Sequence, residues 1–122
     1  MMIRPALLAF IATIIVTLTY QNAAAECVTV KYRETPVCID KFACVDTPRS
    51  SFVRSVCYDE VKSYMLIKLR DTWYHYCSVD AASVKNLVSA DSVGRYYNGH
   101  FRSRGATHGP FDCRDHPVPS YQ

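Results

Sequence analysis

Six cysteines in a chain of 122 residues constrain this protein more than any other feature of its sequence. An even number of cysteines in a small exported domain is typical of a disulfide framework, whereas reducing compartments keep thiols free. The alternative is a zinc site, but such sites usually show two closely spaced ligand pairs, and Cys113 with His116 is the one Cys/His pair here with two residues between its members. We therefore expect disulfides, and no metal site, at Cys27, Cys38, Cys44, Cys57, Cys77 and Cys113.

The first 25 residues have the three parts of a secretory signal peptide. Arg4 is the only charged residue before an uncharged run over residues 6–19, and small residues follow at Ala23 and Ala25. This order predicts cleavage between Ala25 and Glu26. An uncleaved membrane anchor is the alternative, although a spanning helix needs about 20 apolar residues. We expect a periplasmic or secreted protein with no stable membrane span after cleavage.

The net charge of the chain does not by itself indicate a nucleic-acid partner. The chain carries 14 Lys and Arg against 11 Asp and Glu, a formal charge of +3. Loss of residues 1–25 removes one basic residue, Arg4, and leaves 13 against 11. With 49% hydrophobic and 20% charged residues, the chain is expected to fold into a globular domain rather than to stay disordered.

The chain after the signal peptide predicts one small α+β domain. Residues 26–50 read as an extended N-terminal segment with short strands at 28–32 and 37–39, and Pro48 disfavours helix at its end. Strands rich in aromatic and β-branched residues follow at 52–58, 63–69 and 73–77. The connections between these strands are short enough for hairpins, so we expect a small antiparallel β-meander.

Two short helices are expected after the meander. Asp80 suits the N-cap of the first helix and Ser92 the N-cap of the second, which Gly99 weakens. Their apolar faces consist of Val84, Leu87 and Val88, and of Val93, Tyr96, Tyr97 and Phe101. The Gly and Pro residues from 105 to 122 predict an extended C-terminal tail, tied only by Cys113.

The meander order limits which cysteines can pair. Cys57 and Cys77 fall on its outer strands, about 9–10 Å apart across the strand between them. A disulfide joins Cα atoms no more than about 7 Å apart, so this pair is excluded. The preferred pairs are Cys44–Cys57, Cys77–Cys113 and Cys27–Cys38. They would staple a β extension and the tail over the sheet face that the helices leave uncovered, and so support a small core.

Two motifs within residues 51–104 carry a family resemblance. Tyr74-His75-Tyr76 lies in the last strand, and residues 90–98 read ADSVGRYYN, which has the form A-x-S-x-G-[RK]-[FY]-[FY]-N. Through these residues, residues 51–104 resemble the KTSC domain, a small module named after the C-terminus of some lysyl-tRNA synthetases. One departure is Asp80, where the family usually has Pro, and Asp can cap the helix instead. The resemblance implies no catalytic residue, and it suggests RNA as a partner.

Tyr74 and Tyr76 are candidate binding residues because they share one face of a strand. Their spacing would let them stack two bases, as sheet platforms do in RNA-binding domains. The alternative, which we favour, is that both rings pack the sheet against the helices.

A basic stretch without acidic residues over 92–111 is the second candidate binding feature. It contains Arg95, His100, Arg102 and Arg104, together with His108. Arg95 and Arg102 are seven residues apart and would share a helix face. The stretch would bind an anion, most strongly at low pH, or it is a solvated helix face. The expected partner is an anionic envelope component or a protein, since nucleic acid is an unlikely partner of an exported protein.

The sequence contains no catalytic motif, neither G-x-S-x-G, H-E-x-x-H, a glycine-rich phosphate loop nor C-x-x-C. A Cys–His hydrolase would need Cys77 as a free thiolate beside His75 or His100, and a disulfide sulfur is no nucleophile. We therefore expect no enzyme and no cofactor. The leading hypothesis is an exported, non-catalytic binding or structural module. The alternatives are an RNA-binding module and, less favoured, a Cys/His-dependent enzyme.

Overall fold

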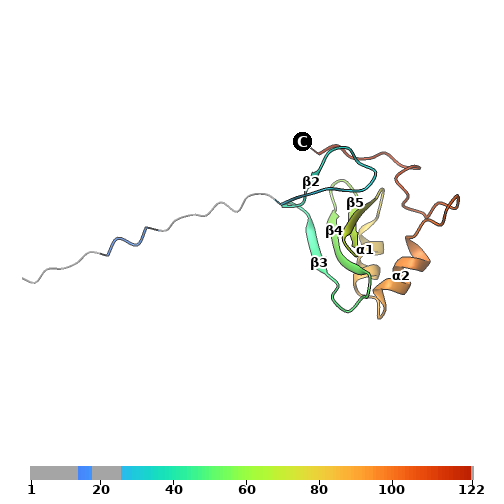
Figure 1. Cartoon of the computed structure of the whole chain (residues 1–122), viewed down its shortest axis with the longest axis horizontal. Coiled ribbons are helices and arrows are strands. Elements are labelled where there is room, and N and C mark those ends of the chain that lie inside the picture. The colour runs from blue at the N-terminus through green and yellow to red at the C-terminus, as the bar shows by residue number, and fades with distance from the viewer. Residues whose placement is uncertain (1–13, 18–25, 122) are drawn as a thin grey trace, which may run out of the picture.

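The computed structural model describes residues 14–17 and 26–121, and Figure 1 shows the arrangement of its elements. The predicted cleavage site and most of the predicted signal peptide lie outside the described residues. Within the described residues, no helix has the length and apolar character needed to cross a bilayer.

A four-stranded antiparallel sheet forms the centre of the molecule. Its strands are β3 (Ala43–Asp46), β4 (Val53–Asp59), β5 (Tyr64–Leu69) and β6 (Thr72–Tyr76), and their order in the sheet is β3-β4-β5-β6. The predicted α+β fold and the meander of its last three strands are therefore confirmed. β3 was not expected from the sequence. Its four side chains are all exposed, so they show no alternation of apolar and polar residues.

The N-terminal extension is less regular than predicted. β1 (Cys27–Val28) and β2 (Val37–Cys38) pair as two-residue strands, so the predicted strand over 28–32 is too long. The chain leaves β1 after Val28 because Val30 forms a parallel bridge with Trp73 of β6. At Tyr32 the backbone turns, with a φ of 70°. The extension thus pairs partly with itself and partly with the edge of the main sheet.

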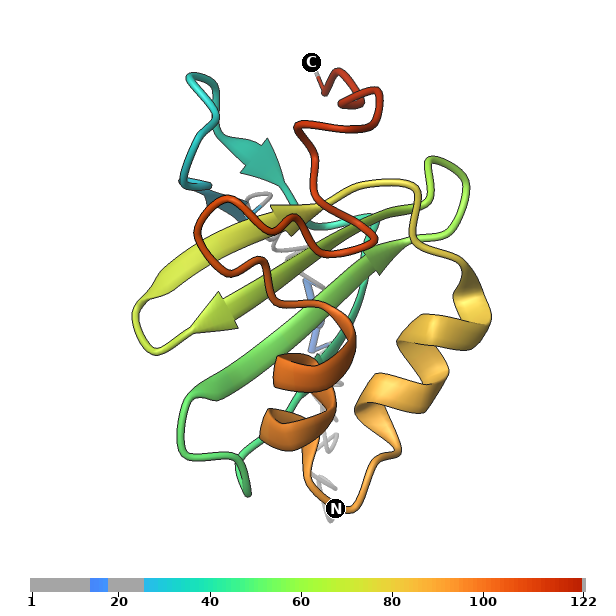
Figure 2. The same cartoon turned by 90° about the vertical axis from the view of Figure 1, so that its right-hand side faces the viewer.

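Both helices lie on one face of the sheet (Figure 2). They are α1 (Ala81–Val88) and α2 (Val93–His100). The predicted N-caps are confirmed, since the side chain of Asp80 accepts from the amide of Ser83 and that of Ser92 from the amide of Arg95. These bonds satisfy backbone donors that have no partner within a helix.

The inner strands of the sheet have buried residues on both faces, and β5 contributes to two cores. Met65 and Ile67 point to the helices, where they pack with Leu87 of α1 and Tyr97 of α2. The alternate residues Tyr64 and Leu66 point to the other face. There the N-terminal extension supplies Val28, Val30, Val37, Ile39 and Phe42. A module with so few residues therefore buries apolar surface on both sides of one sheet.

The three disulfides have the preferred pairing. Cys27–Cys38 closes the β1–β2 hairpin, Cys44–Cys57 joins β3 to β4, and Cys77–Cys113 joins the end of β6 to the tail. No cysteine among the described residues is free. Three disulfides in a chain of this size indicate an oxidising compartment.

The C-terminal tail is held by more than Cys113, which corrects the sequence-based expectation. Arg33 donates to the carbonyl of Pro119 over 2.9 Å, and Lys62 donates to that of Ser120 over 2.6 Å. The hydroxyl of Tyr121 donates to Asp59, and its ring packs beside Phe42 and Tyr64. These contacts join segments far apart in the chain, which local sequence patterns do not indicate.

Candidate functional site

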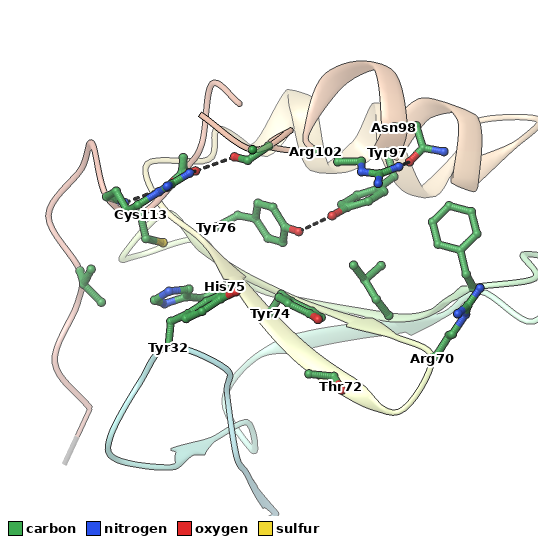
Figure 3. Close-up of a pocket in the computed structure, with 17 residues that line it drawn as sticks. Tyr32, Arg70, Thr72, Tyr74, His75, Tyr76, Tyr97, Asn98, Arg102 and Cys113 are labelled. Carbon is green, nitrogen blue, oxygen red and sulfur yellow. Dashed lines mark hydrogen bonds and ion pairs between the residues drawn. The ribbon is translucent and has the colours of Figure 1, made fainter. Parts of the chain in front are cut away.

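An open cleft of about 1060 Å³ lies between β6, α2 and the chain that follows α2 (Figure 3). Tyr74 and Tyr76 of β6 and Tyr97 of α2 are among its aromatic residues, and Arg70 and Arg102 contribute cationic side chains. We call this site the tyrosine cleft. It is larger than a second cavity of about 630 Å³ beside Cys44 and Cys57, and unlike that cavity it contains residues of both predicted candidate sets.

Tyr76 and Tyr97 meet across the tyrosine cleft from opposite layers. Their hydroxyl oxygens are 2.6 Å apart, and both side chains are buried. Their rings are in edge contact, which is a favourable arrangement for an aromatic pair. Loss of hydration raises the pKa of both hydroxyls above the ordinary value for tyrosine, so both are protonated at neutral pH.

Tyr74 lies nearer the mouth of the cleft and is only partly buried. It pairs with Ile67 across the sheet. Its ring centre is 6.5 Å from that of Tyr32, which is 80% exposed. The ammonium group of Lys31 lies 5.6 Å from the centre of the Tyr74 ring. The mouth of the cleft therefore combines exposed aromatic surface with a positive charge.

Phe52 forms part of the cleft wall because α2 approaches it closely. A Cβ atom on Gly94 of α2 would lie only 2.7 Å from the Phe52 ring, so glycine allows this approach. The Phe52 ring also contacts the Tyr97 ring edge-on, with their centres 6.1 Å apart. The glycine of the ADSVGRYYN motif thus has a packing role beside the cleft.

The cations of the tyrosine cleft differ in their partners. Arg114 binds Asp112 in two-point fashion, through Nε and Nη2 at 3.0 and 2.7 Å. This pair, with a hydrogen bond from Ser103, holds the pKa of the Asp112 carboxyl well below its usual range. Arg70 and Arg102 form no ion pair among the described residues. The cleft therefore presents two arginines that no described carboxylate neutralises.

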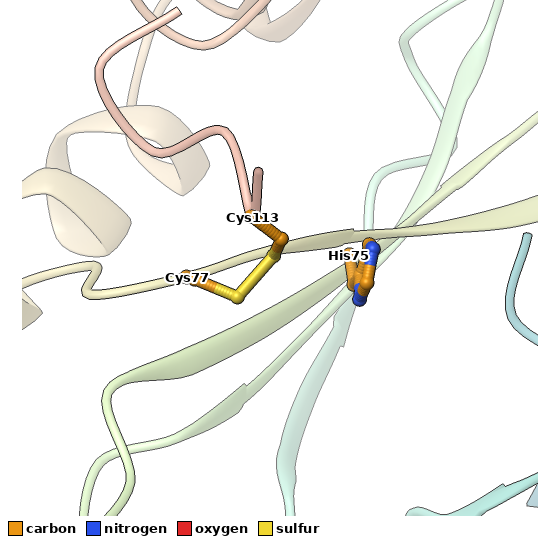
Figure 4. A group of neighbouring side chains, drawn as sticks. All are labelled: His75, Cys77 and Cys113. Carbon is orange, nitrogen blue, oxygen red and sulfur yellow. A yellow bond between two sulfur atoms is a disulfide. The ribbon is translucent and has the colours of Figure 1, made fainter. Parts of the chain in front are cut away.

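His75 also lines the cleft, beside the Cys77–Cys113 disulfide (Figure 4). Its Nδ1 is 2.8 Å from the hydroxyl of Tyr64. Burial, followed by the positive charge of Arg33, lowers the pKa of His75, so the neutral ring is favoured. Neutral His is a good hydrogen-bonding partner for a hydroxyl and does not need a carboxylate.

Two groups of side chains have the spacing of metal ligands. His75, Cys77 and Cys113 lie within 4.8 Å of one another, but the two sulfurs are bonded to each other and ligation requires thiolates. His108, Asp112 and Asp115 form the second group, and hydrogen bonds to Arg114 and within the group already use its carboxylates. Neither group in this state has the chemistry of a resident metal centre.

The structure brings together three of the six predicted binding residues. Tyr74, Tyr76 and Arg102 line the tyrosine cleft, whereas Arg95, His100 and Arg104 are exposed outside it. Arg95 and Arg102 were expected on one helix face. α2 ends at His100, so Arg102 lies beyond the helix and returns over its last turn to Asn98.

Other cleft residues were not singled out as binding residues. Tyr97 was assigned to the apolar face of the second helix, and nothing in the sequence indicated that its hydroxyl would reach a binding site. Arg70 sits in the β5–β6 turn with a φ of 54°, and Tyr32 belongs to the N-terminal extension. Only the packing of α2 and the extension against the sheet brings these residues to one site.

A comparison with protein families assigns the part of the chain that forms β4 to β6 and both helices. Residues 49–104 match the model of the KTSC domain. The chain contains a KTSC domain. The match begins two residues before the predicted boundary at Ser51, and it includes β4, β5, β6 and both helices.

The KTSC domain thus supplies Tyr74, Tyr76, Tyr97 and both unpaired arginines of the tyrosine cleft. Tyr32, Asp112 and Arg114 come from outside it, from the N-terminal extension and the tail. No curated protein matches the chain.

Proposed function

We propose that this protein is an exported, non-catalytic binding module whose tyrosine cleft holds a small anionic ligand. The observation that carries the proposal is the pair of arginines, Arg70 and Arg102, in a cleft whose one carboxylate is already neutralised. Asp112 is bound by Arg114, so it does not compensate the other two charges. Arginine binds carboxylate and phosphate groups more strongly than neutral partners.

Export is part of the proposal. Residues 1–25 have the pattern of a signal peptide, and three disulfides fit an oxidising compartment. The disulfides also support a role without catalysis. A Cys–His enzyme needs a free thiol, and Cys77, which lies beside His75, is bonded to Cys113.

RNA binding is the alternative function, and it finds less support. Tyr76 is only 7% exposed, and α2 covers its ring, so Tyr74 and Tyr76 do not form an open platform for two bases. Arg95, His100 and Arg104 do not line the cleft. The favoured interpretation of Tyr76, as a ring packed between sheet and helix, agrees with its place in the core.

The test is a titration of the oxidised protein with phenyl phosphate, followed by calorimetry or amide chemical shifts. We expect Arg70→Gln and Arg102→Gln each to weaken binding about tenfold, since each removes a charge-assisted hydrogen bond. The matched control is Arg95→Gln, because Arg95 is an exposed arginine of α2 and does not line the cleft. Equal losses in all three variants would contradict a specific site.

A short single-stranded RNA serves as the second probe. If RNA is the partner, its association constant will fall steeply with salt, by about 0.7 logarithmic units per phosphate contact for each tenfold increase in salt. Arg95→Gln and Arg104→Gln would then weaken binding as well. We expect instead no salt-dependent RNA binding at physiological ionic strength.

A further inference from the structure

The hydroxyls of Tyr76 and Tyr97 carry two protons, and the hydrogen bond between them requires only one. Each phenol has one proton to donate, and the two oxygens share a single hydrogen bond of 2.6 Å. Neither oxygen has another hydrogen-bond partner among the described residues. One of the two O–H groups therefore donates to its neighbour, and the other has no acceptor within the described protein.

This second O–H group lies in a place where a ligand can reach it. Both tyrosines line the tyrosine cleft, and Figure 3 shows their hydroxyls meeting between β6 and α2. A ligand that displaces water from this donor keeps its affinity only where it supplies an acceptor in place of the water. An acceptor atom entering the cleft would do so, whereas a ligand that offers only donors would not.

The surroundings of the pair favour an acceptor that carries negative charge. Arg102 lines the same cleft, and its positive charge acts on the Tyr97 hydroxyl. Arg102 is in turn near Asn98, whose side-chain oxygen lies 3.5 Å from Nη1. A donor and a cation thus converge at one end of the cleft, as in sites that recognise the oxygens of an acid.

The remaining surface of the cleft favours a flat, apolar body. Phe52 and Tyr74 are partly buried, so each presents part of a ring to the cleft. Leu69 and Val118 add apolar lining, and Val118 is 44% exposed. Aromatic walls bind flat rings in offset or edge-on contact.

We propose that the ligand of the tyrosine cleft is a small aromatic acid. An oxygen of its deprotonated carboxylate, phosphate or sulfate accepts the unshared hydroxyl proton of the Tyr76–Tyr97 pair beside Arg102, and its ring packs between Phe52 and Tyr74. This inference rests on the proposed function, because it names the class of anion that the cleft binds.

The experiment compares probes and hydroxyl variants in the oxidised, exported protein with the whole chain from Glu26 onward. Phenyl phosphate and benzoate test the acid with a ring, inorganic phosphate tests the acid alone, and benzyl alcohol tests the ring alone. We expect the two aromatic acids to bind at least tenfold more tightly than inorganic phosphate or benzyl alcohol.

The variants separate the hydroxyl donor from the rest of the site. In Tyr97→Phe or Tyr76→Phe the remaining hydroxyl loses its neighbour but keeps its proton, so each single variant should lose at most about threefold in affinity. The double variant has no donor and should lose tenfold or more. Tyr58→Phe is the matched control, because its hydroxyl donates to the Val79 carbonyl and does not line the cleft.

The possible results show separately whether the inference or the proposed function is wrong. If no acid binds the wild-type protein, both are wrong. If aromatic acids bind in an Arg102-dependent way and the double variant binds them as tightly as wild type, the hydroxyl donor is wrong and the anion cleft stands. If inorganic phosphate binds as tightly as phenyl phosphate, the aromatic part is wrong. Should the double variant fail to fold, the probe series on wild-type protein still tests the anion and the ring. The two single variants then test the hydroxyl pair, because a tenfold loss in either of them would contradict a donor that the other hydroxyl can replace.

Discussion

At the scale of single residues, two side chains of β6 that look alike in the sequence have different environments. Tyr76 lies opposite Met65, is 7% exposed and meets Tyr97. Tyr74 lies opposite Ile67, nearer the cleft mouth, and is only partly buried. The strand places both rings on the helix face, and the position of α2 decides how much of each ring is covered.

Replacing these two tyrosines should therefore give unequal losses of stability. Tyr76→Ala removes a buried ring and its hydrogen bond, and should lower the free energy of unfolding by about 3–5 kcal/mol. Tyr74→Ala should cost about 1–3 kcal/mol, because less of its surface is removed from water. Denaturant unfolding monitored by circular dichroism measures both. A larger loss for Tyr74→Ala than for Tyr76→Ala would contradict the arrangement described.

His75 gives a prediction about pH. Its pKa is lowered in the folded protein, first by burial and then by Arg33, while Asp112 acts in the opposite direction. The unfolded state therefore binds more protons as the pH falls below about 6.5, the ordinary value for histidine. His75 therefore lowers the free energy of unfolding as the pH falls from about 6.5 towards the folded pKa of its ring, and it has no such effect above pH 6.5.

His75→Gln should accordingly reduce the fall in the free energy of unfolding between pH 7 and pH 5. The control is His100→Asn, because His100 is exposed on α2. Urea unfolding at several pH values measures the slopes. An unchanged slope in His75→Gln, or an equal change in the control, would show that another group causes the pH dependence.

At the scale of elements, the disulfides attach the segments that flank the KTSC domain to its sheet. Cys44–Cys57 joins β3 to β4, where both residues also pair in the ladder. Cys77–Cys113 holds the tail, which supplies Asp112 and Arg114 to the cleft. The sequence separations of the bonded cysteines are 11, 13 and 36 residues.

Removal of each disulfide should lower the stability of the fold, and the loss should be larger where the disulfide closes a longer loop. Loop-closure entropy predicts a loss of about 4 kcal/mol for Cys77→Ala with Cys113→Ala, and about 3 kcal/mol for each of the two shorter loops. The Cys77–Cys113 variant should also weaken anion binding, because it releases one wall of the cleft. The Cys44–Cys57 variant serves as the control with intact binding, because neither residue lines the cleft. Thermal unfolding and the phenyl phosphate titration together check both parts.

At the scale of the whole molecule, the sheet has one face for the helices and one for the extension and tail. The tyrosine cleft lies where these parts meet, because it takes residues from the KTSC domain, from the N-terminal extension and from the tail. A KTSC domain cut out at residues 49–104 would therefore lack part of the cleft and all three disulfides, because Cys27, Cys38, Cys44 and Cys113 lie outside its borders.

Export gives the prediction at this scale. The exported protein should begin at Glu26, because Ala23 and Ala25 suit the two small-residue positions of a cleavage site. Its intact mass should lack residues 1–25 and be lower by six hydrogens, two for each disulfide. Mass spectrometry of the secreted or periplasmic fraction measures both. An N-terminus at Met1 would contradict cleavage, and a fully reduced mass would contradict the oxidising compartment.

The features that the sequence alone determined are local or follow from simple distance limits. The aromatic and apolar residues of 63–69 predicted a strand, Asp80 and Ser92 were identified as N-caps, and the reach of a disulfide excluded Cys57–Cys77. Each inference depends on neighbours in the chain, or on the spacing of adjacent strands, and the structure agrees with each.

The tertiary structure alone decided the features that depend on packing between distant segments. β3 forms because the register beside β4 pairs Cys44 with Cys57, although its own side chains are exposed. Tyr76 and Tyr97 meet because α2 crosses β6, and Arg102 joins them because the helix ends at His100. No local pattern encodes these distances, because they arise from the fit of buried side chains across the whole domain. The candidate site therefore emerged only once the helices, the extension and the tail were placed on the sheet.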